Sequence, residues 1–552
     1  SSRRSGNIFI AIYECIMLAM LVHQVLSLVA VVLMKEAQCS AQSRPNIVMI
    51  VIDDLGWNDV GFHGSKQIPT PNIDGLASSG VILNRYYVTP LCTPTRSAIM
   101  TGKLPIHTGL QDGVITGNDP RGIPLSDTLL PQYLQNLGYR THAIGKWHLG
   151  HFQKKYLPTN RGFDTHMGHW LGYNDYYDHT IFEDYQTPVW GYDLRRNLDV
   201  AYDAFGHYST DLYTDEAVAV ISHHNNSQPM FLYLAHQATH SATVFQPLQA
   251  PVETVNKFNH IKDKNRRIFA AMMSKVDDSV GRVVEALALN KMLSNTVIIF
   301  TTDNGGPAAG FNNNAASNWP LRGMKHTVWE GGVRAAGFVW SLKHIKSPYV
   351  STSLMSVEDW LPTLYEAAGG PLSDVTAVDG VSQWKMITQN VPAIRKEVLH
   401  QINRQYAAIT VGDYKLVTGF DQNDGWYGPS GRDEPLLNVN LRPGKEYSVV
   451  KSLLKKYSTP MKKMNAEIIC QGGPPTPDKA CHPSKSHCLY NTVKDPCEYH
   501  DLSDTEPDIL TKLKKRLAEY NATAVAPNNP AQDPRADPKY FDYVWTNWYD
   551  YI

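Results

Sequence analysis

Short apolar runs that end in polar or glycine-rich turns recur along the chain from residue 46 onward. The first, Asn46 to Ile52, is rich in β-branched residues and ends at Asp53-Asp54-Leu55-Gly56. A continuous run of this kind is typical of a strand that is buried on both faces of a parallel sheet. Four further runs have the same form: Tyr139 to Ile144, Met230 to Ala235, Val297 to Thr301 and Gly337 to Trp340.

Helical patterns lie between these runs, over Ser126 to Asn136, Asp211 to His223 and Ile268 to Leu289. Strands that alternate with helices predict an α/β fold, in which helices flank a large, mostly parallel central sheet. Ligands of such sheets bind outside the carboxyl ends of the strands. Because polar clusters follow several of the predicted strands, we expect those clusters to share one active site.

The pattern changes near residue 390. Glu397 to Ile402, Ala407 to Val411 and Tyr414 to Val417 read as short antiparallel strands, with Gly412-Asp413 as a tight turn. Residues 421–485 are predicted to form loops, and Glu506 to Tyr520 an amphipathic helix with a solvated basic face. The sequence therefore predicts a catalytic domain over residues 42–390 and a smaller C-terminal domain over residues 391–552, built on an antiparallel sheet.

The N-terminal segment, residues 1–41, differs from the remainder in composition. Arg3 and Arg4 precede a long apolar run, and small residues follow it up to Ala41. This order is typical of a secretory signal that is cleaved after Ala41, and an uncleaved membrane anchor is the alternative. The secretory route leads to a lysosomal or an extracellular destination. The sequons at Asn225 and Asn521 are consistent with a glycoprotein on that route.

Cysteines and net charge narrow the class of protein further. Four cysteines cluster near the C-terminus, and in an oxidising compartment they predict two disulfides with three alternative pairings, a zinc site being the competing interpretation. These residues are Cys470, Cys481, Cys488 and Cys497. The 552-residue chain has a net charge of −1, so no overall field favours nucleic acid or an anionic membrane.

Two polar pairs at predicted strand ends are candidate metal ligands. Asp53 and Asp54 are adjacent carboxylates, which repel each other unless a cation neutralises them, and oxygen ligands suit calcium or magnesium. Asp303 and Asn304 follow another strand. Each pair alone is as typical of a turn or a helix cap as of a metal site. Together, at neighbouring strand ends, the two pairs provide four oxygen ligands for one ion.

A lone cysteine stands at the start of a predicted helix in Leu91-Cys92-Thr93-Pro94-Thr95-Arg96-Ser97-Ala98. Free backbone N–H groups and the positive end of the helix dipole suit an anion there. Arg96, one turn into the helix, adds a planar charge that binds an oxyanion in two places. An isolated motif of this kind is more often a buried cysteine beside an ordinary helix cap.

The stretch C-T-P-T-R-S-A-I-M-T-G resembles the signature of the sulfatase family, with Thr95 where serine is usual. The resemblance implies that Cys92 is oxidised to formylglycine by the formylglycine-generating enzyme and that its hydrated aldehyde is the nucleophile. It also implies one divalent cation, calcium rather than magnesium. The implied ligands are Asp53, Asp54, Asp303, Asn304 and the residue made from Cys92.

Further motifs carry the same resemblance. Gly145-Lys146-Trp147-His148-Leu149-Gly150 resembles a second sulfatase motif, which implies that Lys146 holds a sulfate oxygen and that His148, whose ordinary pKa lies near neutral, takes a proton. His240 and Lys325 match positions that contact sulfate and protonate the leaving oxygen, His236 being the alternative to His240. The predicted catalytic residues are Cys92, Arg96, Lys146, His148, His240 and Lys325.

Within the family the chain is most similar to the arylsulfatase B, or N-acetylgalactosamine-4-sulfatase, type. This likeness implies hydrolysis of sulfate esters on galactosamine glycans. A small aryl or plant-derived sulfate, such as a glucosinolate, is the alternative substrate, because the Tyr-, Asp- and His-rich loop 169–207 diverges and is expected to line the pocket. A phosphatase or phosphodiesterase of the same superfamily and a secreted sulfate-binding glycoprotein are the alternative functions.

Overall fold

The computed structural model describes residues 17–27, 44–184, 188–420, 423–428, 448–462 and 464–552. Of the predicted N-terminal signal or anchor, residues 17–27 form an exposed helix, and the other residues up to Ala41 lie outside the described part of the chain. Among the described residues, no helix combines the length and the apolar character that a membrane span needs.

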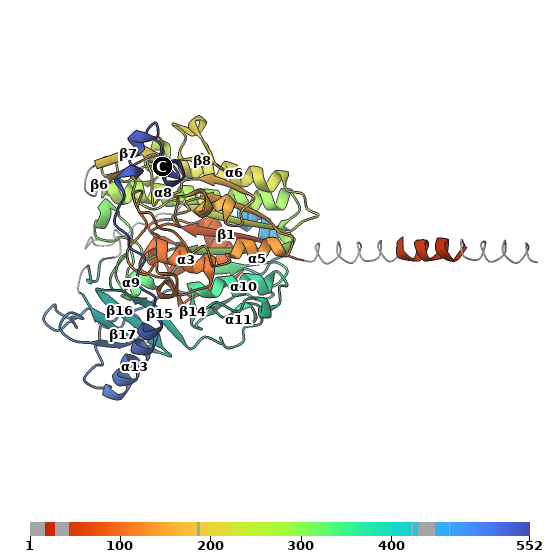
Figure 1. The fold of residues 1–552 in the computed structure, drawn as a ribbon. Coiled ribbons are helices and arrows are strands. Elements are labelled where there is room, and N and C mark those ends of the chain that lie inside the picture. Colours follow the sequence, from red (N-terminus) through yellow and green to blue (C-terminus); the bar gives the residue numbers. More distant parts are fainter. Residues whose placement is uncertain (1–16, 28–43, 185–187, 421–422, 429–447, 463) are drawn as a thin grey trace, which may run out of the picture.

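A ten-stranded mixed sheet forms the centre of the molecule (Figure 1). Its five middle strands, β11, β1, β10, β4 and β5, are mutually parallel, and the strands beyond them include antiparallel pairs. The predicted large, mostly parallel sheet is therefore confirmed. In spatial order the strands are β13 (Tyr349–Ser351), β2 (Val81–Leu83), β12 (Phe338–Trp340), β11 (Thr296–Thr302), β1 (Asn46–Ile52), β10 (Met230–His236), β4 (Arg140–Gly145), β5 (Thr165–Gly168), β8 (Arg195–Arg196) and β9 (Asp199–Val200).

Both faces of this sheet are covered, as the continuous apolar run of β1 predicts. Val48, Ile50 and Ile52 point to one face and Ile47 and Met49 to the other, because successive side chains of a strand alternate. The first face packs against α2 (Pro71–Ala77), α6 (Ser209–His223), α7 (Val252–Val255), α8 (Lys264–Leu289) and α12 (Val449–Lys456). The second packs against α3 (Cys92–Thr101), α5 (Leu130–Asn136), α10 (Trp360–Ala367) and α11 (Trp384–Gln389).

Several helices differ in their bounds from the sequence-based prediction; α8, for example, begins at Lys264 and not at Ile268. The helix expected from Ser126 begins at Leu130, because Pro131 lies in its first turn and the Gln132 side chain accepts a hydrogen bond from Leu129 N at 2.8 Å. The expectation of loops throughout 421–485 is wrong for α12. There Ser448 caps the helix, and Val450 and Leu454, four residues apart, are buried.

A four-stranded antiparallel sheet forms the smaller C-terminal unit, as predicted. Helix α13 (Pro507–Thr523) packs on it, and the cysteines pair as Cys470–Cys497 and Cys481–Cys488. Its strands are β15 (Glu397–Ile402), β16 (Tyr406–Val411), β17 (Tyr414–Gly419) and β18 (Cys488–Asn491). The remaining elements are the β14 (Met355–Ser356) and β3 (Tyr86–Tyr87) pair, the β6 (Thr180–Asp184) and β7 (Pro188–Tyr192) hairpin, α4 (Pro105–Thr108) and α9 (Glu330–Val333).

The C-terminal tail after α13 returns to the large sheet and ends near the β6–β7 hairpin (Figure 1). Asn528 N donates to the Gly109 carbonyl at 2.8 Å, and Trp545 N donates to the Tyr192 carbonyl at 3.0 Å. The Trp545 ring is fully buried, and Gly117 lies against it with no room for a side chain. The tail therefore holds the loop that follows α4 and the end of β7.

Candidate active site

The two polar pairs predicted as metal ligands lie side by side. Strands β1 and β11 are parallel neighbours with Ile52 opposite Thr302, so the residues that follow them emerge at the same edge of the sheet. Asn304 Nδ2 donates to Asp54 Oδ1 at 2.7 Å, and Asp54 N donates to Asp303 Oδ1 at 3.4 Å. Asp53, Asp54, Asp303 and Asn304 are all fully buried.

Basic residues from the neighbouring strands meet these carboxylates. Lys146, just after β4, places its Nζ 2.6 Å from Asp53 Oδ2. Lys325, in the loop between β11 and α9, places its Nζ 2.7 Å from Asp54 Oδ1. Burial alone would raise the pKa of Asp54, but the charge of Lys325 and hydrogen bonds from Lys325 and Asn304 lower it to about 2. Asp54 is therefore ionised at any working pH.

Helix α3 brings Cys92 and Arg96 to the same place. Arg96 Nε donates to Asp303 Oδ2 at 2.9 Å, its Nη2 lies 2.8 Å from the same oxygen, and its Nη1 donates to the Lys146 carbonyl at 3.2 Å. Cys92 is the first residue of the helix, is buried and is in no disulfide. Burial raises the pKa of its thiol, although the nearby charges of Lys146 and Lys325 oppose that shift.

Both active-site histidines have a lowered pKa. Burial and the charge of Lys146 lower the pKa of His148 well below its usual value. Its Nε2 donates to the Ile115 carbonyl at 2.8 Å, and its Nδ1 has no hydrogen-bond partner among the described residues. Burial and Lys325 likewise lower the pKa of His240 to about 3. Both imidazoles are neutral.

His240, rather than the alternative His236, belongs to this site. The Nε2 of His240 lies 3.6 Å from Asp54 Oδ2, and its Nδ1 donates to the Ser241 carbonyl at 2.6 Å. His236 instead contacts Ser279 on α8, with its Nε2 at 2.9 Å from the hydroxyl. The reason is that His236 is the last residue of β10 and faces the helix layer, whereas His240 follows in the loop at the strand end.

The donor set fits a hard divalent cation. Asp53 Oδ1 and Asn304 Oδ1 are buried and have no hydrogen-bond partner in the described part of the chain, and such oxygens are stabilised by a cation. Ligand atoms of Asp53, Asp54 and His240 lie within 4.8 Å of one another. The pKa of Asp303 is raised to about 6 by burial and by the negative charge of Asp53.

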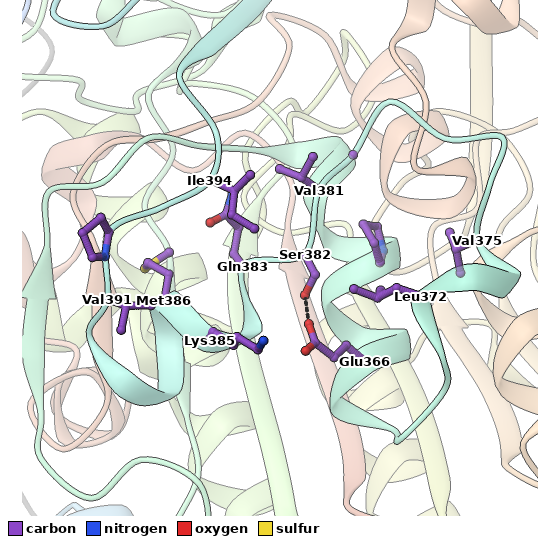
Figure 2. Close-up of a pocket in the computed structure, with 13 residues that line it drawn as sticks. Glu366, Leu372, Val375, Val381, Ser382, Gln383, Lys385, Met386, Val391 and Ile394 are labelled. Carbon is purple, nitrogen blue, oxygen red and sulfur yellow. Dashed lines mark hydrogen bonds between the residues drawn. The ribbon is translucent and has the colours of Figure 1, made fainter.

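A separate pocket of about 340 Å³ lies between α10 and α11 (Figure 2). Apolar side chains such as Leu372 and Ile394 face it, and the Ser382 hydroxyl donates to the Glu366 carboxylate at its edge (Figure 2). None of the predicted site residues lines this pocket, so it is distinct from the strand-end site.

Sequence reasoning missed residues that hold the site in place. Thr95 Oγ1 accepts a hydrogen bond from Thr89 N at 3.0 Å, so the hydroxyl in the cysteine motif anchors the loop before α3. Thr93 Oγ1 donates to the His148 carbonyl at 3.2 Å. Tyr173 stacks on His240, with ring centroids 5.6 Å apart and an interplanar angle of 16°. The predicted loop 169–207 thus reaches the site, but no local pattern singled out Tyr173.

Comparisons with known proteins agree with this geometry. Residues 45–370 match the protein-family model described as Sulfatase. The chain is 38% identical over 536 residues to arylsulfatase J of Mus musculus, covering 93% of this chain and 82% of that protein. It is 32% identical to N-acetylgalactosamine-6-sulfatase of Mus musculus, covering 68% of this chain and 72% of the relative. The crystal structure of Ps i-CgsB in complex with k-i-k-neocarrahexaose is similar, with a TM-score of 0.68, 28% identity and coverage of 88% of this chain and 94% of that one.

Proposed function

This chain belongs to the sulfatase family and is a sulfuric ester hydrolase, and from that premise we propose that it cleaves sulfate monoesters through a formylglycine made from Cys92 beside a bound calcium ion. The observation that carries the proposal is the convergence of Cys92 at the start of α3 with three carboxylates and three cationic side chains. These charged residues come from three strand ends, one helix and one loop: Asp53, Asp54, Asp303, Arg96, Lys146 and Lys325.

The thiol itself is a poor nucleophile in this setting. Its pKa is raised by burial, and a neutral thiol attacks far more slowly than a thiolate. A hydrated formylglycine at position 92 would supply a hydroxyl that attacks sulfur and a second hydroxyl that lets sulfate depart as the aldehyde re-forms. The buried neutral thiol therefore supports the modified residue over a conventional cysteine nucleophile.

Calcium would be held by Asp53, Asp54, Asp303 and Asn304, with His240 at the edge of the same cluster. When bound, the cation would supply Lewis-acid stabilisation of negative charge. Because Asp53 and Asp54 each also contact a lysine ammonium, the carboxylate charge is shared between the ion and the protein.

The protein side chains provide charge at the sulfuryl group and places for protons. The guanidinium of Arg96 and the ammonium groups of Lys146 and Lys325 stabilise the negative charge that spreads over the sulfuryl oxygens. His148 keeps Nε2 protonated against the Ile115 carbonyl, so its Nδ1 is the atom that accepts a proton. Burial would lower the pKa of Lys325, but the charge of Asp54 raises it, so the ammonium stays charged. His240 or Lys325 then protonates the leaving oxygen.

The finer substrate assignment is a sulfated galactosamine glycan, as in the arylsulfatase B type. The names of the relatives support it: one is an N-acetylgalactosamine-6-sulfatase, and the similar crystal structure holds a hexasaccharide. The proposal includes synthesis on the secretory route, modification by the formylglycine-generating enzyme, and a lysosomal or extracellular destination. It takes residues 42–390 as the catalytic domain and 391–552 as the C-terminal domain.

Peptide mass and activity test the proposal together. We expect the peptide that contains Cys92 to have exchanged one sulfur and two hydrogens for one oxygen, and the Cys92→Ala enzyme to lose turnover of p-nitrophenyl sulfate. If the peptide mass shows an unmodified thiol at Cys92 in every molecule, and the protein binds sulfate esters without turnover, the result would support the sulfate-binding glycoprotein instead. Preferred turnover of p-nitrophenyl phosphate by the thiol form would support the phosphatase.

A further inference from the structure

The loop after β5 lies directly against both active-site histidines. A Cβ atom at Gly172 would lie 2.9 Å from Cε1 of His148, so the backbone approaches that ring more closely than a side chain would allow. The next residue, Tyr173, stacks on the His240 ring, with centroids 5.6 Å apart. Residues 172 and 173 therefore lie against both histidines of the candidate active site.

A line of aromatic residues continues from Tyr173. The hydroxyl of Tyr173 donates to the carbonyl of Phe182 on β6, which fixes the two residues to each other. The Phe182 ring meets the Phe245 ring edge to face, with centroids 5.5 Å apart and an interplanar angle of 66°. Phe245 follows His240 by only five residues, so the line leads back to the same active site.

The outer end of this line is exposed to solvent. The Phe245 side chain is 80% exposed and its neighbour Val244 is 62% exposed. A single exposed apolar residue needs no explanation, but here the exposed ring ends a line of aromatic residues that begins at His240 and is joined by two ring contacts and one hydrogen bond to a backbone carbonyl. Exposed aromatic faces bind rings with apolar faces, both aromatic rings and the C–H faces of sugars.

We propose that Phe182 and Phe245 form a subsite for a second ring of the substrate, next to the ring that carries the sulfate ester. The proposal rests on the proposed sulfatase function and adds the size of the substrate to it. The sulfated ring lies against Tyr173 and His240, and the following ring lies on Phe245. The substrate is thus an ester with at least two rings, the second of which has an apolar face.

The test compares one-ring and two-ring substrates in the Phe245→Ala enzyme. The pairs are a sulfated N-acetylgalactosamine with a sulfated disaccharide, and phenyl sulfate with biphenyl-4-yl sulfate. Loss of one aromatic contact should lower kcat/KM for a two-ring substrate about three- to tenfold and leave its one-ring partner unchanged. A loss confined to the sugar pair identifies a glycan, and one confined to the aryl pair identifies an aryl ester.

Three controls make the result specific. Leu289→Ala removes a side chain that is equally exposed, at 79%. Leu289 ends α8 just before β11 begins, and so lies at the edge of the sheet opposite the active site. This variant should leave kcat/KM unchanged for every substrate. Phe245→Trp should retain the two-ring preference. Inhibition by inorganic sulfate should be the same in Phe245→Ala and wild type, because sulfate does not reach Phe245.

The two proposals fail in different ways. Equal effects of Phe245→Ala on one-ring and two-ring substrates, or no effect on either, would overturn the subsite while wild-type turnover leaves the sulfatase mechanism intact. Undiminished turnover in the Cys92→Ala enzyme would overturn the mechanism whatever the behaviour of Phe245.

Discussion

Replacement of Arg96 by lysine separates the shape of the guanidinium from its charge. Arg96 is fully buried and bridges two parts of the site: Nε and Nη2 both contact Asp303 Oδ2, at 2.9 Å and 2.8 Å, and Nη1 donates to the Lys146 carbonyl at 3.2 Å. A lysine keeps one positive charge but has a single nitrogen. It can neutralise Asp303 or hold the Lys146 loop, but not both.

The magnitude follows from the contacts that are lost. A hydrogen bond to a charged group contributes about 1.5–3 kcal/mol, and the planar, two-point binding of a sulfuryl oxyanion is lost as well. We therefore expect Arg96→Lys to raise the barrier by about 3 kcal/mol, which lowers kcat/KM on the order of 100-fold. The fall in stability should be smaller, because Asp303 keeps a cationic partner.

The assay is kcat/KM for p-nitrophenyl sulfate with calcium present, together with the thermal midpoint of unfolding. Arg96 lies in the modification motif, so rates are divided by the fraction of formylglycine measured by peptide mass. Arg395→Lys is the matched control: Arg395 contacts Asp359 and Glu358, in a buried cluster that contains none of the predicted site residues. It should lose stability and keep its kcat/KM. A fully converted Arg96→Lys enzyme with kcat/KM within threefold of wild type would refute the reasoning.

Two further predictions concern calcium and pH. Removal of divalent ions with a chelator should lower both kcat/KM and the unfolding midpoint, since an ion at 100 times its Kd stabilises the fold by about 2.7 kcal/mol. Added calcium should restore both quantities. An unchanged midpoint would contradict the proposed ligand set. Glu183 is buried and accepts a hydrogen bond from Gly117 N at 2.8 Å, and burial raises the pKa of its carboxyl from 4.5 to about 8. The folded state then holds a proton that the unfolded state releases, so between about pH 4.5 and about pH 8 stability falls as pH rises, by up to about 1.4 kcal/mol per unit. In Glu183→Gln this pH dependence of the midpoint should be weaker than in wild type, and an identical slope in both enzymes would refute it.

The arrangement of the charged residues was predictable because it follows from strand order. Asp53 and Asp303 each stand just after a continuous apolar run, and parallel strands end at the same edge of a sheet. Recognition of the two apolar runs was therefore enough to predict that Asp53 and Asp303 lie close together. The choice of His240 over His236 depended on resemblance, because the path of the loop after β10, which no local pattern predicts, brings His240 to Asp54.

Other features depended on contacts that sequence does not display. The cysteines allowed three pairings, and only the packed loops select Cys470–Cys497 and Cys481–Cys488. Helix α12 is short, and its burial comes from α2 and α8, far away in the chain. The low pKa of His148 likewise comes from burial and from Lys146, which no property of the histidine itself reveals.

The difference between residues fixed by the core and residues on loops explains how one chemistry serves different substrates. The charged groups come from strand ends and a helix start that the central core fixes. Replacement of any one of them would leave its partner buried without an opposite charge. The substrate side is built from Tyr173, Phe182 and Phe245, which lie on loops and a hairpin outside that core. Replacement of the exposed Phe245 removes no buried group from the core. Loop sequence can therefore alter the accepted rings while the sulfate chemistry persists, which fits relatives whose names carry different substrates.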